Sequence, residues 1–103
     1  KSSPPAAAVD TTAAANQPGP NQLYVNAMDQ LRRGSSATSR TLFQELLTRF
    51  PDSEYSAEAQ YWIGESLARE NNVAAADAAY AAVVSTYPDS ASAPQALYKR
   101  ALL

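Results

Sequence analysis

The chain has 103 residues, a net charge of −2 and an isoelectric point near 4.9, and it contains neither cysteine nor histidine. This length allows at most one domain, and the lack of cysteine excludes disulfides and thiolate metal sites. The lack of histidine removes the commonest general base, and the acidic balance argues against a nucleic-acid-binding face, so we expect no enzyme, no metal, no cofactor and no nucleic-acid partner.

Residues 1–22 are rich in alanine, proline, serine and threonine, and Val9 is their only large aliphatic residue. Such a segment buries too little apolar surface to offset the entropy lost on ordering, which predicts a flexible linker over residues 1–22. The folded domain is then expected to span residues 23–103. No apolar run in the sequence approaches membrane-spanning length, so we predict no direct membrane span.

The helical pattern starts directly after this linker. Leu23, Ala27 and Leu31 share one face of a first helix over residues 21–33, and Gly34 is its expected stop. A second helix is expected over residues 37–49, with serines before it as caps. Its inward positions are expected to be Leu42, Phe43, Leu46 and Leu47.

A turn around Pro51 separates this pair from the next two helices, expected over residues 57–70 and 74–86. Asn71 and Asn72 join these helices and tolerate left-handed backbone geometry. A further helix is expected over residues 95–103, because Pro94 favours a helix start. Its leucines have no covering helix, so we expect either that the parent protein continues past residue 103 or that this helix packs against another molecule, including a second copy.

The two halves of the chain repeat at a fixed offset. An aromatic-Pro-Asp-Ser run starts at Phe50 and again 37 residues later at Tyr87, and the same offset relates Tyr24, Tyr61 and Tyr98. This periodicity predicts a first repeat at residues 23–53, a second at 57–90 and a partial third at 94–103. The first repeat is degenerate, with Ser39 where the second has Ala76, and should be the looser unit.

The second repeat resembles the tetratricopeptide (TPR) pattern. The residues that fit the pattern are Ile63, Gly64, Leu67, Ala76, Tyr80 and Pro88. Gln60 departs from it, because it stands where the pattern has Trp. We therefore predict an all-α fold of TPR-like antiparallel helical hairpins in a right-handed solenoid, with about two and a third repeats.

The first helices of such repeats line the concave surface, so equivalent residues form ladders across it. Tyr24, Tyr61 and Tyr98 form one such series, the tyrosine ladder. Their rings suit partner binding, although they are equally suited to packing between hairpins. The residues expected at the partner-binding face are Tyr24, Met28, Arg32, Tyr61, Glu65, Arg69 and Tyr98. Acidic residues near the turn, such as Asp52, Glu54 and Glu58, are interpreted as a solvated turn with caps rather than a calcium or acid/base site.

The stretch of residues 24–103 resembles the C-terminal TPR domain of the YbgF/CpoB family of the Tol-Pal system. The likeness lies in the AQYWIGESL run at residues 59–67, in the FPDS and YPDS turns, and in SAPQAL at residues 92–97. The resemblance implies a non-catalytic periplasmic adaptor for cell division that binds a TolA-like envelope protein. The BamD-like TPR lipoproteins of outer-membrane protein assembly share similar turns and are the alternative, together with a self-assembling scaffold that uses residues 95–103.

Overall fold

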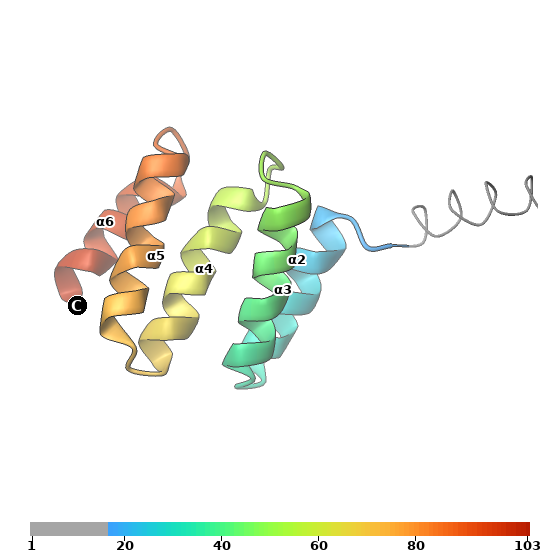
Figure 1. Cartoon of the computed structure of the whole chain (residues 1–103), viewed down its shortest axis with the longest axis horizontal. Helices are drawn as coiled ribbons and strands as arrows, with labels where there is room; N and C mark the ends of the chain where they lie inside the picture. Colours follow the sequence, from blue (N-terminus) through green and yellow to red (C-terminus); the bar gives the residue numbers. More distant parts are fainter. Residues whose placement is uncertain (1–16) are drawn as a thin grey trace, which may run out of the picture.

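The computed structural model describes residues 17–103, whose regular structure consists of five helices (Figure 1). They are α2 (Pro20–Arg32), α3 (Ser36–Arg49), α4 (Ser56–Arg69), α5 (Val73–Thr86) and α6 (Ser92–Leu102). Each helix packs against the next one along the chain, which gives two complete hairpins and one further helix. The predicted all-α, TPR-like fold is confirmed. Most of the linker expected over residues 1–22 lies outside the described residues.

The helices form two layers. The first helices of the repeats, α2, α4 and α6, contact one another in series. Helices α3 and α5 each pack between two first helices, whereas no Cα atom of α3 lies within 8 Å of one of α5. Since the first helices converge and the second helices spread apart, the face formed by α2, α4 and α6 is the inner, concave one.

All five helices begin earlier than the sequence pattern predicts, α2 to α5 by one residue and α6 by three. Helix α2 starts at Pro20, so residues 20–22 belong to it rather than to the linker, and α6 starts at Ser92 rather than at residue 95. In both cases the proline lies within the first turn. The N–H groups of that turn have no partner inside the helix, so a proline there costs no hydrogen bond.

The ends of the first helices of the two repeats have the same backbone geometry. Gly34 and Asn71, 37 residues apart, both adopt positive φ, 86° and 62°, as expected for residues that end a helix in left-handed geometry. The serine caps predicted for α3 are wrong, because Ser35 makes no side-chain cap hydrogen bond. The hydroxyl of Ser36 instead donates to Glu70 on the neighbouring hairpin, at 2.6 Å.

The core is made of two groups of buried side chains. The first group spans both hairpins, and the second fills the space among α4, α5 and α6. The first consists of Leu23, Ala27, Phe43, Leu46, Ala59, Ile63 and Ala79, and the second of Tyr61, Ala76, Tyr80, Val83 and Ala96. Leu42 and Leu47, expected to point inward, are only partly buried.

Gly64 on α4 lies directly against the ring of Tyr80 on α5. A Cβ atom at this position would lie 2.7 Å from both Cδ1 and Cε1 of Tyr80. The first repeat has Ala27 and Phe43 at the equivalent positions. In the second repeat, by contrast, the ring of Tyr80 occupies the space that a side chain at residue 64 would need.

Gln60, the departure from the TPR pattern, has a local role. Its side-chain Nε2 donates to the carbonyl oxygen of Ala79 on α5, at 3.1 Å. A polar side chain here thus ties the two helices of the second hairpin together where the pattern has an apolar ring.

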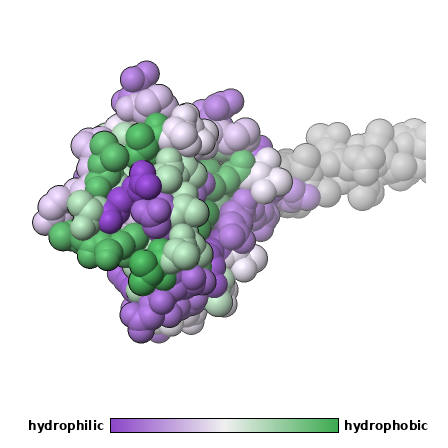
Figure 2. All heavy atoms as spheres, turned by 60° about the vertical axis from the view of Figure 1, so that its left-hand side comes forward, coloured by the Kyte–Doolittle hydropathy of each residue, from purple (hydrophilic) through white to green (hydrophobic). Residues whose placement is uncertain are grey.

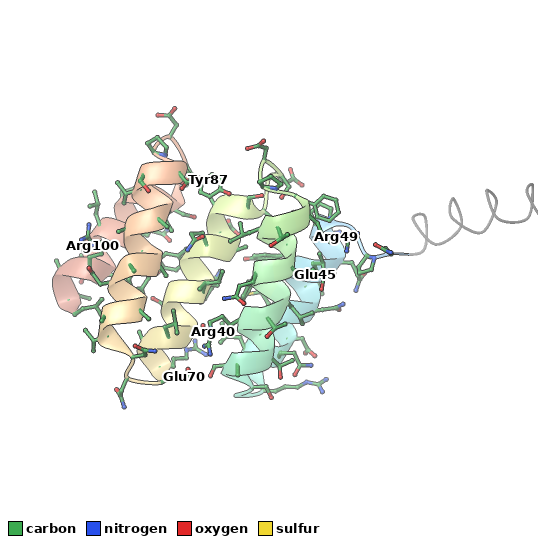
Figure 3. All side chains as sticks on the ribbon, in the orientation of Figure 1. Arg40, Glu45, Arg49, Glu70, Tyr87 and Arg100 are labelled. Atoms are coloured by element: carbon green, nitrogen blue, oxygen red, sulfur yellow. The ribbon has the colours of Figure 1, made fainter. Side chains whose placement is uncertain are left out.

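Polar contacts also join one repeat to the next (Figure 3). Arg40 on α3 pairs with Glu70 at the end of α4, 3.2 Å apart, and Arg100 on α6 pairs with Asp77 on α5 at 2.8 Å. The hydroxyl of Tyr87 donates to the carbonyl oxygen of Pro51, at 2.7 Å, and so connects the two equivalent turns.

Helix α6 carries an apolar surface. Leu97, Tyr98 and Leu102 are 51%, 64% and 62% exposed, and hydrophobic side chains gather on this end of the molecule (Figure 2). Helix α6 buries only small residues, Ser92, Ala93 and Ala96, against its neighbours. Among the helices of residues 17–103, none combines the length and apolar character that a bilayer crossing requires.

Candidate functional site

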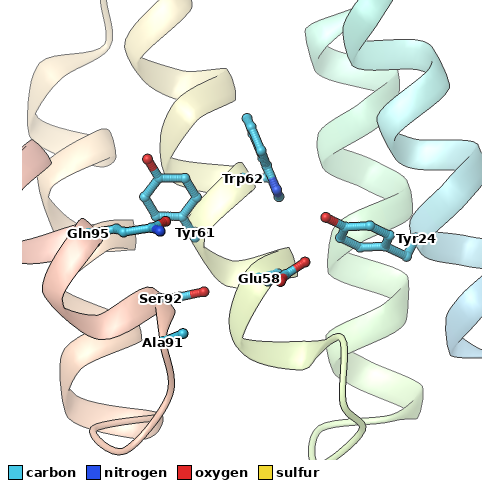
Figure 4. Close-up of a pocket in the computed structure, with 7 residues that line it drawn as sticks. All are labelled: Tyr24, Glu58, Tyr61, Trp62, Ala91, Ser92 and Gln95. Atoms are coloured by element: carbon cyan, nitrogen blue, oxygen red, sulfur yellow. The ribbon is translucent and has the colours of Figure 1, made fainter.

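A pocket of about 250 Å³ opens on the concave face (Figure 4). Its lining comes from all three first helices and from the turn that precedes the last of them. The lining residues are Tyr24, Glu58, Tyr61, Trp62, Ala91, Ser92 and Gln95. The pocket therefore lies where the repeat architecture brings three successive units together.

Helix α4 forms the floor of the pocket, while α2 and α6 form its walls. Tyr61 and Trp62 lie three and four residues after Glu58 on α4, the spacing that places each of them on the same face of the helix as Glu58. Tyr24 projects from α2 on one side, and Gln95 from α6 on the other (Figure 4). A ligand in the pocket would touch all three helices at once.

The ring of Tyr24 is held by other aromatic side chains. It stacks on Tyr55 with centroids 5.2 Å apart and meets the edge of Phe43 at 6.0 Å. Its hydroxyl points toward Glu58 and Trp62 (Figure 4). Burial and the nearby carboxylate of Glu58 raise the pKa of Tyr24 to about 12, so this phenol is neutral at physiological pH.

Tyr61 is mainly a core residue whose side chain reaches the pocket. It is 9% exposed, and its ring contacts Trp62 and Tyr80 at centroid distances of 5.4 and 5.7 Å. Burial and the carboxylate of Glu65 raise its pKa to about 12. Both roles expected for the tyrosine ladder apply to the position of Tyr61, because this residue packs between hairpins and also lines the pocket.

The other residues expected at the partner-binding face lie outside this pocket. Met28 packs against the core, and Tyr98 and Arg32 are exposed. Glu65 accepts a hydrogen bond from Tyr80 and pairs with Lys99 of α6 at 3.1 Å.

Arg69 donates to the carbonyl oxygen of Leu31 at 3.4 Å. Glu65 and Arg69 therefore connect helices of the stack. Of the seven expected residues, Tyr24 and Tyr61 are brought together at the pocket.

Three important pocket residues were not predicted as binding residues. Trp62 is off the TPR pattern, Glu58 was interpreted as part of a solvated turn, and Gln95 was expected only as the first residue of a helix. A signal exists in the sequence for two of them: Glu58 lies one helical turn before Tyr61, and Gln95 is the equivalent of Glu58 one repeat later, 37 residues on. Extending the ladder by one turn toward the N-terminal end of each first helix identifies Glu58 and Gln95, but not Trp62.

The chemistry of the pocket is aromatic and acidic. Three aromatic rings line it, and Glu58 is the one charged residue among the described residues that do so. Polar side chains of Ser92 and Gln95 complete the opposite wall. Such a surface offers apolar contact together with a few hydrogen-bonding groups, the combination that small binding pockets use for orientation and specificity.

The comparison with known families agrees with a TPR-type envelope protein. A family model named YfiO, described as outer membrane lipoprotein, matches residues 16–103. This is the BamD-like group, the alternative of the two resemblances, and the match does not extend to the YbgF/CpoB assignment. No curated protein matches the chain. Because the family match covers most of the sequence and all five helices, the chain belongs to the YfiO family of outer membrane lipoproteins.

Proposed function

We propose that this chain is a non-catalytic protein-protein interaction module of the cell envelope, and that it binds a partner segment in the groove formed by α2, α4 and α6. The observation that carries this proposal is the aromatic pocket built from three successive repeats on the concave face. Tyrosine and tryptophan are enriched among residues that dominate binding energy, because their rings give a large contact area with a polar tip. Family membership and the TPR-like fold support the same class of function.

The partner has two candidate identities. Membership of an outer membrane lipoprotein family favours a component of outer-membrane protein assembly. The resemblance of residues 59–67 and of the repeated turns to the YbgF/CpoB family favours a TolA-like protein and a role in the Tol-Pal system and cell division. Both identities imply that the domain faces the periplasm.

Calorimetric titration tests this function. The chain is titrated with the periplasmic part of TolA and, separately, with the periplasmic domains of the outer-membrane protein assembly machinery. Gln95→Trp places a large ring over the open side of the pocket, and Gln44→Trp makes the same change on the exposed side of α3.

We expect one partner to bind, with affinity reduced about tenfold or more by Gln95→Trp and unchanged by Gln44→Trp. The partner that binds decides between the two identities. Binding that Gln95→Trp leaves intact would move the site away from the groove, and no binding of either partner by the folded chain would contradict the proposed function.

Self-association through residues 95–103 is a second proposed interaction. The exposed Leu97, Tyr98 and Leu102 on α6 support it, since neighbouring apolar side chains on one surface are typical of an interface. Sedimentation of the chain at several concentrations tests it: a mass that rises with concentration and falls back in Leu102→Ser supports the contact, whereas a monomer throughout contradicts it.

A further inference from the structure

Glu58 is one of four carboxylates in residues 17–103 that form no ion pair, with Asp52, Glu54 and Asp89, and it is the one that lines the pocket. Asp29, Glu45, Glu65, Glu70 and Asp77 each form an ion pair with an arginine or lysine. Glu58 lies in the first turn of α4 and has no ion pair with any residue of the described chain. The helix dipole stabilises a carboxylate in that turn, but it does not account for the aromatic rings placed around it.

The carboxylate of Glu58 lies beside aromatic rings. Tyr24, Tyr61 and Trp62 line the same pocket as Glu58, and the Tyr24 hydroxyl points toward the carboxylate (Figure 4). The raised pKa of Tyr24 agrees with this proximity. Negative charge beside aromatic rings is complementary to a cation, because both the carboxylate and the faces of the rings attract positive charge.

We propose that the pocket binds an arginine side chain of the protein partner, with Glu58 as the residue that pairs with its guanidinium. This inference rests on the proposed function, since it names the chemistry that the groove recognises. A pocket of about 250 Å³ is smaller than those that hold drug-sized ligands and suits one side chain.

Arginine fits better than lysine for geometric reasons. The guanidinium is planar, stacks on aromatic rings and donates several hydrogen bonds in fixed directions, whereas an ammonium is a compact and strongly hydrated charge. The carboxylate of Glu58 can accept two parallel hydrogen bonds from it. The side-chain oxygens of Ser92 and Gln95 on the opposite wall offer further acceptors.

The direct test uses a small probe and the fluorescence of Trp62, the one tryptophan of the chain and a lining residue. N-acetyl-arginine N-methylamide is titrated into the chain, and the neutral citrulline analogue of the same shape serves as the ligand control. Glu58→Gln removes the charge in the pocket. Asp89→Asn makes the same charge change at an exposed carboxylate in the turn before α6.

We expect the arginine probe to bind with a dissociation constant on the order of millimolar, and the citrulline probe to bind about fivefold more weakly or worse. Glu58→Gln should weaken the binding of the arginine probe by a similar factor, and Asp89→Asn should leave its dissociation constant unchanged. Equal binding of the two probes, equal binding by the wild type and Glu58→Gln, or no binding of the arginine probe would each overturn the inference. Circular dichroism checks that Glu58→Gln remains folded.

Failure of the arginine inference can be distinguished from failure of the proposed function. If the protein partner binds, and Gln95→Trp weakens it while Glu58→Gln does not, the groove is the binding site but it does not recognise arginine through Glu58. If neither candidate partner binds while the arginine probe still depends on Glu58, the pocket has the proposed chemistry and the proposed partners are wrong.

Discussion

At the scale of single residues, two buried serines have opposite surroundings. Ser66 donates to the carbonyl oxygen of Ile63 at 2.7 Å and accepts from Arg40 at 3.3 Å. Ser39 is equally buried, and its hydroxyl has no hydrogen-bond partner anywhere in the described residues. Since a buried polar group without a partner keeps its full desolvation cost, these serines should respond to substitution in opposite ways.

We predict that Ser39→Ala stabilises the domain by about 1 kcal/mol and that Ser66→Ala destabilises it by about the same amount. The second repeat already has alanine at the equivalent of position 39, Ala76, so the space accommodates a methyl group. Urea unfolding followed by circular dichroism measures both changes. Destabilisation by both substitutions would show that the hydroxyl of Ser39 is satisfied in solution.

The contact between Gly64 and Tyr80 gives a second prediction at this scale. Gly64→Ala should destabilise the domain by about 2 kcal/mol, because the new Cβ would overlap the ring of Tyr80, which is 1% exposed. Replacing that ring in the double variant Gly64→Ala/Tyr80→Leu should remove part of the additional cost. A double-mutant cycle on urea unfolding measures the coupling, and additive effects of the two substitutions would contradict direct contact.

The tyrosines make stability depend on alkaline pH. Tyr24 and Tyr61 have pKa values of about 12 in the folded chain, compared with 10.0 for the free side chain, and burial and Glu65 also raise the pKa of Tyr80. Below about pH 10 the tyrosine hydroxyls keep their protons in both the folded and the unfolded chain. Above it the unfolded chain loses protons that the folded chain retains, so stability falls as the pH rises from about 10 to about 12.

Urea midpoints at about pH 9 and about pH 11 measure this loss. Tyr61→Phe should reduce the fall between the two values, whereas Tyr98→Phe, at an exposed ring, should not. An identical fall in both variants would assign the alkaline effect to other groups.

At the scale of helices, α6 is held less firmly than the helices before it. Its buried residues are small, and its leucines and tyrosine face solvent. Helix α4, by contrast, packs against α3 and α5 and contributes to both groups of core side chains. Stability is therefore expected to be uneven along the solenoid, as in other repeat folds.

We predict that in the 103-residue chain the backbone amides of α6 exchange with solvent faster than those of α4 and α5. Hydrogen exchange with mass spectrometry, resolved to peptides of each helix, measures this order. The predicted looseness of the first repeat is checked in the same experiment, by comparing α2 and α3 with α4 and α5. Exchange of α6 as slow as that of α4 would indicate that another surface covers it, such as a second copy.

The helices themselves were predictable because they depend on local signals. Apolar spacing, the offset of 37 residues and the left-handed positions at Gly34 and Asn71 gave the correct number of helices in residues 17–103, with boundaries wrong by three residues at most. The start of α6 was the least predictable, since a proline fits anywhere in the first turn. The expected serine caps failed because Ser35, at the N-cap, makes no side-chain cap hydrogen bond and Ser36 already lies inside the helix, where its hydroxyl donates to Glu70, which is distant in sequence.

At the scale of the whole molecule, the curvature of the stack determines the site. Tyr24 and Tyr61 were predictable from the repeat, because equivalent residues of first helices form a ladder. The repeat offset also indicates Glu58 and Gln95, whereas the contribution of Trp62 depends on how closely α2, α4 and α6 converge, which a single sequence does not specify. The same convergence lets Glu65 and Arg69 form contacts within the stack, although they were expected at the partner-binding face.

The central claim is that the concave face binds the partner, and photocrosslinking in the cell envelope tests it most directly. p-Benzoylphenylalanine is introduced at position 95 in the groove or at position 44 on α3 of the protein in its native host, and the crosslinked proteins are identified by mass spectrometry. We predict that position 95 crosslinks to an envelope protein and that position 44 does not. Crosslinks to the same protein from position 44, with none from position 95, would contradict the assignment of the groove as the binding site.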